Sequence, residues 1–399
     1  MVQLNDHNLI FPLAGFGNRF KEVGYKQTKP LIHAGKQTII EWAVNSVKLN
    51  DSINLIFVVR RDQCIRYGID SFLKQTFPSC RVIQIDGPTN GSLETILIAL
   101  KKLNLSGYLH IHTSDIALPV SIDIKDIFID NSIDAVTYTF KANNPSYSYC
   151  KLKKEDSDII DLMMEKELIS QLANVGVYSF RKIQDFIDSA EEIISLGLKQ
   201  KNEYYISSVF NNLIDKGKKV RSIDIPEVHV IGTPKELNFF TKFIIPTMSP
   251  KKIGFVSDHS GYIFKDEIMK LFKEDNYLTV NYGCYSESSC DYSDYVPIAT
   301  KGINESEVDL VIASCKSGQG VNICANHQLN VISILPNNQE ELFKARKHNC
   351  PNFITFASNK WSHKEAFNAF KKAFKLTHFE GGRHSTRIQK FIRNDFGNN

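Results

Sequence analysis

Short apolar runs alternate with amphipathic stretches along the first part of the chain. The apolar runs that predict strands are residues 9–13, 55–60, 82–85 and 109–112. The stretches between them that repeat apolar side chains at helical spacing are residues 39–47, 63–73 and 93–103. Such alternation is typical of parallel strands joined by crossover helices, which is an α/β layered fold.

The pattern is less regular in the next part of the chain and then resumes. Residues 135–140 and 174–180 predict strands, and residues around 181–196 and 203–216 predict helices. A second series begins near residue 251. It comprises a helix at 262–274 and strands at 252–257, 277–281, 310–314, 331–335 and 352–356.

Residues 243–250 (FIIPTMSP) separate the two series. This segment carries two prolines and no periodicity, which favours a linker. We therefore expect two α/β domains, residues 1–247 and 248–399, each with a Rossmann-like parallel sheet. The two series share their alternation but no motif, so they are not repeats.

Composition excludes several classes of protein. The chain has 399 residues, 42% of them hydrophobic, which argues against global disorder. A net charge of +4 is too small to indicate a nucleic-acid binder. No apolar run approaches the ~20 residues that span a bilayer, and residues 1–20 lack the pattern of a signal peptide, so we expect a cytoplasmic protein that does not bind membranes. The eight cysteines show no zinc or disulfide spacing.

A glycine-rich turn follows the first predicted strand. Gly15 and Gly17 would let backbone N–H groups approach phosphate oxygens, and Arg19 and Lys29 would neutralise charge during phosphoryl or nucleotidyl transfer. The glycines alone are equally compatible with a tight turn beside solvent-facing basic residues.

The longer string LAGFGNRF followed by KPL resembles the signature of sugar-phosphate nucleotidyltransferases, which join a nucleoside triphosphate (NTP) to a sugar phosphate and release pyrophosphate. Further matches follow in order over about 240 residues: GSLET at 91–95, TSD at 113–115, EK at 165–166, NVG at 174–176 and GTP at 232–234.

The resemblance implies a role for each matching residue. Arg19 and Lys29 would hold the triphosphate, and Asp115 would bind Mg²⁺. The nucleotide-binding residues would be Leu13, Ala14, Gly15, Gly17, Gly91 and Ser92, and the sugar-side residues Glu165, Lys166 and Asn174. Many members place a second metal-binding Asp where this chain has Val230. Either another acid completes the site, or Asp115 and the nucleotide phosphates suffice.

Two predicted strands of the second series end in polar residues suited to proton transfer. Asp258 and His259 follow the first strand, where they would lie at a ligand-binding sheet edge or simply cap the next helix. Cys315 ends another strand before a glycine-rich turn and a helix. We expect a lowered pKa for this thiol, and backbone N–H groups beside it that hold an oxyanion; the alternative is an inert buried thiol.

The ordered motifs DHSGY, CDYSDY, CKSGQG, CANH, KHN and FEGGRHSTR, between residues 252 and 390, resemble the ribose-5-phosphate isomerase B family, which includes galactose-6-phosphate isomerase subunits. The resemblance implies a five-stranded αβα sandwich, isomerisation of phosphorylated aldoses and ketoses without a cofactor, and a homodimer formed through this half. Cys315 would be the base, Ser317, Gly318 and Gly320 would border the enediolate, and Asp258 and His348 would assist ring opening. His259, Arg383 and Arg387 would bind phosphate, and Tyr292 and Asn349 would line the pocket.

Two departures from this family bear on activity. Lys316 replaces a usual glycine, and Ile332 replaces a phosphate-side arginine. We expect a bifunctional enzyme that supplies an activated sugar for surface polysaccharide. The alternatives are a nucleotidyltransferase whose second half only binds ligand or holds a dimer, and a sensor in which neither half is catalytic.

Overall fold

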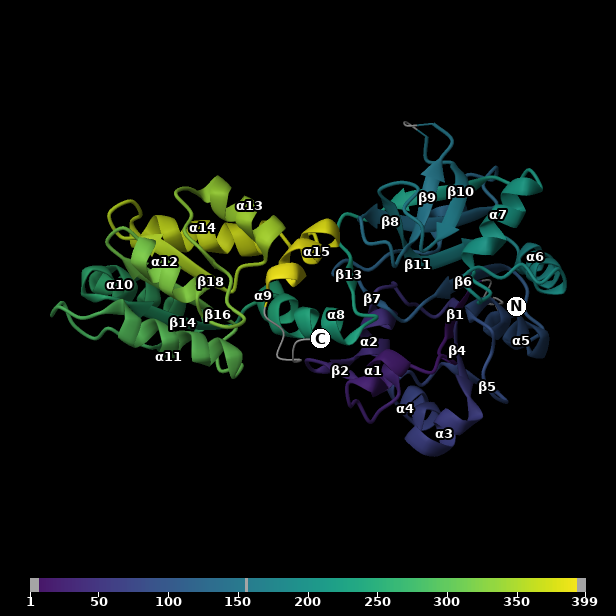
Figure 1. Cartoon of the computed structure of the whole chain (residues 1–399), viewed down its shortest axis with the longest axis horizontal. Helices are drawn as coiled ribbons and strands as arrows, with labels where there is room; N and C mark the ends of the chain where they lie inside the picture. The colour runs from purple at the N-terminus through teal and green to yellow at the C-terminus, as the bar shows by residue number, and fades with distance from the viewer. Residues whose placement is uncertain (1–6, 155–156, 393–399) are drawn as a thin grey trace. The chain divides into compact units, whose positions relative to one another are not determined.

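The computed structural model describes residues 7–154 and 157–392, and the chain forms two compact units (Figure 1). The first unit ends at Leu237 and the second begins at Asn238. The first six residues of the N-terminal segment discussed above lie outside the described residues.

A mixed sheet of nine strands, counted over the described residues, forms the centre of the first unit. Its parallel part has the order β6 (Tyr108–His112), β1 (His7–Pro12), β4 (Ile53–Arg60) and β5 (Arg81–Ile85). β11 (Leu172–Phe180) joins β6 antiparallel. The remaining strands lie beyond β11 and are β8 (Ala135–Lys141), β9 (Ser148–Leu152), β10 (Ile160–Glu165) and β12 (Val220–Asp224).

Helices cover both faces of this sheet because its central strands alternate buried apolar side chains between the two faces. Ile10 and Ile56 pack in the cluster that includes α5 (Ser92–Lys102), α6 (Ile183–Ser195) and α7 (Ser207–Asp215). Leu9 and Phe57 pack in the opposite cluster with α2 (Ile39–Asn45) and α4 (Ile69–Thr76).

The helix predicted at 63–73 is two helices, α3 (Arg61–Tyr67) and α4. Gly68 divides them with φ of 63°, a left-handed conformation that favours glycine. The shorter elements of the first unit are α1 (Asn18–Glu22), η1 (Lys29–Leu31), β2 (His33–Ala34), β3 (Gln37–Thr38), β7 (Ile116–Ala117), η2 (Asp126–Phe128), β13 (His229–Val230) and α8 (Pro234–Phe239).

The second unit is built on a five-stranded parallel sheet, again counted over the described residues, which agrees with the expected sandwich. Its order is β15 (Leu278–Asn281), β14 (Lys252–Ser257), β16 (Leu310–Cys315), β18 (Phe353–Ala357) and β17 (Ser333–Ile334).

Alternate residues of these strands face two helical layers. Phe255 and Ile312 pack in the cluster that includes α10 (Tyr262–Glu274), α13 (Gln339–Asn349) and α14 (His363–Leu376). Val256 and Cys315 pack in the cluster that includes α11 (Tyr292–Asn304) and α12 (Gln319–Asn326). After β14 the second unit also has η4 (His259–Gly261) and α15 (Gly382–Phe391).

The prediction of a linker at 243–250 was wrong for most of its length. A π-helical segment, η3 (Phe240–Ile244), and α9 (Ile245–Met248) occupy residues 240–248. Pro246 is compatible with this helix because it lies in the first turn of α9, where a backbone N–H is not required. The buried guanidinium of Arg346 donates to the carbonyl of Thr247 at 2.5 Å, which fastens α9 to α13 within the second unit.

Among the described residues, no helix is long and apolar enough to cross a membrane.

Candidate active sites

The glycine-rich loop of the first unit joins β1 to α1. Gly17 caps α1 with φ of 64°, and a Cβ atom there would lie 3.3 Å from the Cβ of Lys29. The carbonyl of Ala14 accepts a hydrogen bond from Arg60 at 2.6 Å, and that of Gly15 accepts one from Gln63 at 3.2 Å. Side chains from the end of β4 and from α3 therefore fix the shape of the loop and bring it against Lys29.

Lys29 and Asp115 form a short ion pair, which joins two residues assigned to one site from sequence. The Asp115 side chain is 46% exposed. The Ile231 N–H donates to the backbone carbonyl of Asp115 at 2.7 Å, and a Cβ on Gly232 would lie 3.0 Å from its Oδ2. The late Gly-Thr-Pro segment therefore lies beside the proposed metal ligand.

A second acid stands near this pair. Glu236 on α8 accepts hydrogen bonds from the Thr233 hydroxyl at 2.9 Å and from the Tyr147 hydroxyl at 3.3 Å. Burial raises the pKa of Glu236, the Asp115 carboxylate raises it further, and Lys29 lowers it.

Val230, by contrast, pairs with Ile116 in β13 and offers no ligand. Carboxylate oxygens are the ligands that Mg²⁺ prefers, so Asp115 and Glu236 are the side chains described here that would offer ligands to a magnesium ion. The sequence reasoning missed Glu236, whose only signal was its spacing from Thr233, typical of a helix-capping box.

Gly91 and Ser92 lie at the start of α5. Gly91 has φ of 135°, and a Cβ there would lie 2.3 Å from the backbone oxygen of Tyr204. The Leu93 N–H also donates to this oxygen, at 3.2 Å. Only glycine fits this close approach of two backbone segments.

The sugar-side residues have different surroundings. Lys166 donates to the Tyr205 hydroxyl at 2.7 Å, and the charge of Arg19 also acts on Tyr205, which brings the two cations to one region. Glu165 is buried and accepts from Ser207 at 2.9 Å, and burial raises its pKa. Asn174 is buried too, and its amide donates to Thr137 at 2.7 Å. Lys166 is thus the most available of the three for a ligand.

In the second unit, hydrogen bonds connect the ends of β14 and β16. Asp258 Oδ1 accepts from the Ser260 hydroxyl at 2.7 Å and from the Gly261 N–H at 3.0 Å. The Ser260 hydroxyl oxygen in turn accepts from the Lys316 N–H at 3.0 Å. Asp258 therefore caps η4, as the alternative from sequence held, and it is also held beside the cysteine strand.

Cys315 is 6% exposed at the end of β16, and its sulfur accepts from the Gly318 N–H at 3.1 Å at the N-terminus of α12. Burial raises the pKa of this thiol, and the Asp258 carboxylate raises it further, whereas the backbone N–H groups of Val321, Gly318 and Ser317 lower it. The expected lowered pKa was wrong because burial outweighs the amides. Backbone N–H groups do lie beside the sulfur, as expected.

His259, Tyr292 and Gly320 lie around this cysteine turn. His259 Nδ1 lies 3.2 Å from the backbone nitrogen of Cys290 and 3.1 Å from its carbonyl oxygen, which fixes the ring and leaves Nε2 for a ligand. A Cβ on Gly320 would lie 2.6 Å from the Tyr292 ring, so Tyr292 packs against the start of α12. The structure thus brings these residues together with Asp258 and Cys315.

The two departures differ in consequence. Lys316 is exposed and its φ is negative, so its side chain is accommodated without strain. Ile332 is buried, and its N–H donates to Asn352 at 2.8 Å. It supplies no charge for a phosphate.

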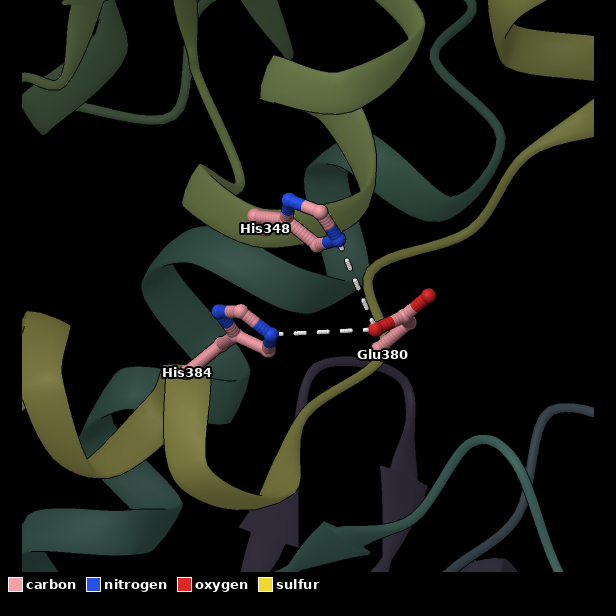
Figure 2. Close-up of side chains that lie close together, drawn as sticks. All are labelled: His348, Glu380 and His384. Atoms are coloured by element: carbon pink, nitrogen blue, oxygen red, sulfur yellow. Dashed lines mark ion pairs between the residues drawn. The ribbon is translucent and has the colours of Figure 1, made fainter. Parts of the chain in front are cut away.

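His348, Asn349, Arg383 and Arg387 form a separate group, at the end of α13 and on α15. His348 Nε2 and His384 Nε2 each lie 3.7 Å from Glu380 Oε2, and the two rings stack with centroids 4.5 Å apart (Figure 2). Over the described parts of the chain, no hydrogen bond or ion pair joins this group to the Cys315 turn.

Comparison with known proteins places the fold of the first unit. A nucleoside-diphosphate-sugar pyrophosphorylase structure from Vibrio cholerae RC9 superposes with a TM-score of 0.53 at 24% identity, covering 59% of this chain and 99% of that one. The likeness shows a nucleotidyltransferase fold, as the motifs predicted.

The second unit matches whole proteins in sequence. Residues 253–391 match the Ribose/Galactose Isomerase family. Ribose-5-phosphate isomerase B of Escherichia coli is 30% identical over 139 residues, 35% of this chain and 93% of that protein. A candidate sugar phosphate isomerase of Rickettsia conorii is 32% identical over 143 residues, 36% of this chain and 99% of that protein. Through its second unit, the chain belongs to the ribose/galactose isomerase family.

Proposed function

We propose that the chain is a bifunctional enzyme, in which the second unit isomerises a phosphorylated sugar and the first transfers a nucleotidyl group to a sugar or polyol phosphate. The placement of Cys315 carries the first half of this proposal. Its sulfur lies at a helix N-terminus, 3.1 Å from the Gly318 N–H, with Asp258 held nearby. A base and oxyanion donors in contact are what an enediolate intermediate requires.

In this mechanism the Cys315 thiolate removes the proton from C2 of the open-chain aldose. The electron pair moves onto the C1 carbonyl oxygen, which gives an enediolate held by the N–H groups of the turn. A proton passes from O2 to O1 in the enediolate, Cys315 returns its proton to C1, and O2 becomes the carbonyl oxygen of the ketose. The raised pKa of Cys315 makes it a strong base once it is deprotonated.

His348, Arg383 and Arg387 would come to this turn from a second copy of the chain. Their place on α13 and α15, apart from the Cys315 turn, supports a homodimer whose two sites each combine residues of both copies. Arginines one helical turn apart suit a phosphate group.

In the first unit, the contact of Lys29 with both the glycine loop and Asp115 supports nucleotidyl transfer. Asp115 and Glu236 would hold Mg²⁺, which neutralises phosphate charge. Lys29, Arg19 and the N–H groups of the loop would bind the triphosphate. Both cations stabilise charge that develops as pyrophosphate departs.

The test is a screen of each NTP against pentose, hexose and polyol phosphates, in which pyrophosphate, product masses and aldose–ketose conversion are measured. Cys315→Ala should abolish isomerisation and leave pyrophosphate release unchanged, and Arg19→Ala should do the reverse. Cys324→Ala on α12 and Lys21→Ala on α1 are matched controls that should retain both activities. A wild type with transferase activity alone would leave the second unit a ligand-binding or dimerisation module.

A further inference from the structure

The side chains of His348, Glu380 and His384 meet at one point of the second unit. His348 ends α13, Glu380 precedes α15, and His384 lies in the first turn of α15 (Figure 2). One carboxylate oxygen, Glu380 Oε2, faces the Nε2 atoms of both rings at 3.7 Å. The rings are almost parallel, with an interplanar angle of 7°.

The other side of Glu380 is fixed by its neighbour on α13. Lys347 Nζ lies 2.9 Å from Oε1, and the Glu380 N–H donates to the Lys347 carbonyl at 3.0 Å. Burial acts to raise the pKa of Glu380, but Lys347 and the two histidines lower it overall. Glu380 is therefore an anchored carboxylate that presents a single oxygen to two imidazoles.

The geometry favours one added proton, rather than two, on the His348 and His384 rings taken together. Stacked imidazolium rings at 4.5 Å would repel each other. His384 is 9% exposed, and its Nε2 accepts a long hydrogen bond from Arg383 Nε at 3.5 Å, which requires a neutral ring. Burial, His348 and Arg383 lower the pKa of His384. The ring that can direct an Nε2–H at Glu380 is then His348, whose side chain is 41% exposed.

The same three side chains resemble a metal site of two imidazoles and a carboxylate, because their ligand atoms lie within 4.8 Å of one another. The surrounding charges argue against a metal. Lys347 already neutralises Glu380, and Arg383 and Arg387 act electrostatically on His384. A divalent cation would enter a region that is already positive.

We propose that Glu380 is a positioning residue that holds His348 as an imidazolium, with its Nδ1–H directed away from the carboxylate as the acid that opens the sugar ring. This rests on the proposed isomerase activity. In the step, Nδ1 gives its proton to the ring oxygen of the aldose, the bond from C1 to that oxygen breaks, and the C1 hydroxyl gives its proton to Asp258 as the carbonyl forms. Glu380 balances the charge of His348 before the transfer.

The first experiment measures protonation directly in the full-length protein. Histidine ¹³Cε1–¹H resonances are titrated by NMR, with His348→Asn used to assign the His348 signal. Glu380→Gln should lower the proton affinity of His348 roughly fivefold, as for a partly exposed charge pair. Glu340→Gln, at the other end of α13, is the matched control and should change it less than twofold.

An unchanged titration of His348 in Glu380→Gln would overturn the proposal. One equivalent of Zn²⁺ should leave both histidine signals in place at neutral pH. Their joint shift would show a metal site instead.

The second experiment separates ring opening from proton transfer at carbon. An aldopentose 5-phosphate closes a ring through O4, whereas the matching 2-ketose has its O5 blocked by phosphate and stays open. Glu380→Gln should slow aldose isomerisation at least tenfold, yet leave deuterium exchange at C1 of the ketose in D₂O within twofold. Cys315→Ala should abolish both.

Equal losses of the two reactions in Glu380→Gln would refute a role in ring opening. An inactive wild type would refute the proposed isomerase activity, and the histidine titration would still decide the pairing.

Discussion

Replacement of Gly318 by alanine tests whether the backbone conformation of the cysteine turn requires glycine at this position. Gly318 has φ of 76°, which costs a residue with a Cβ about 1–2 kcal/mol. The new Cβ would lie 2.3 Å from Leu335 Cδ1, so Leu335 must leave its rotamer at a cost of about 1 kcal/mol. Gly318→Ala should therefore destabilise the second unit by about 2–3 kcal/mol, roughly 30- to 150-fold in the unfolding equilibrium constant.

The assay uses the two tryptophans of the chain. In a Trp42→Phe background, Trp361 reports the second unit, where it packs against Phe356. Urea unfolding followed by its fluorescence should show a lower midpoint for Gly318→Ala. Adding Leu335→Ala should recover the steric part, about 1 kcal/mol, as a coupling energy in a double-mutant cycle.

Gly318→Ala should also move the N–H of residue 318 away from the sulfur. Alkylation of Cys315 should then be slower, because this N–H lowers the pKa of the thiol. The reasoning would be refuted by an unchanged midpoint together with an unchanged alkylation rate.

Three further predictions concern single groups. Gly91→Ala should abolish pyrophosphate release while isomerisation persists, because its Cβ meets the backbone of Tyr204; full transferase activity would contradict this. Since burial raises the pKa of Cys315, iodoacetamide should modify this thiol appreciably only at a pH above the usual thiol pKa, as mass spectrometry of the labelled peptide would show. Fast labelling at pH 7 would contradict this prediction. Burial lowers the pKa of His110 to about 3 and of His112 to about 4, from 6.5. Below pH 6.5 the unfolded chain thus binds more protons than the folded chain. Each histidine should therefore lower the free energy of unfolding of the first unit by about 2 kcal/mol at pH 5. A urea midpoint of that unit that stays constant from pH 7 to pH 5 would count against this.

Much of the fold followed from the sequence because central parallel strands are buried on both faces and therefore read as apolar runs. This holds for β1, β4 and β16, which were predicted within a few residues. The strands β9 and β10 were missed. Exposed residues interrupt both strands after one to three buried positions, and a charged segment lies between them in the sequence, so neither gives a continuous apolar run or a regular alternation.

The candidate sites were predictable only where a motif lay on one stretch of chain. The glycine loop and Asp115 follow a strand and Cys315 ends one, and strand ends are recognisable. Glu236 and the contacts of Glu380 became visible only through neighbours that come from other elements. The pKa of Cys315 was predicted in the wrong direction because burial depends on the whole second unit and no local pattern reveals it.

The contact between Thr247 and Arg346 has a practical consequence for any attempt to produce the isomerase unit alone. The family match begins at residue 253, which invites a fragment cut there. Such a fragment would lose the Thr247 carbonyl that accepts from the buried guanidinium of Arg346, two residues before His348 on the same helix. A fragment that starts at Asn238 retains this acceptor and with it the support of the helix that carries His348.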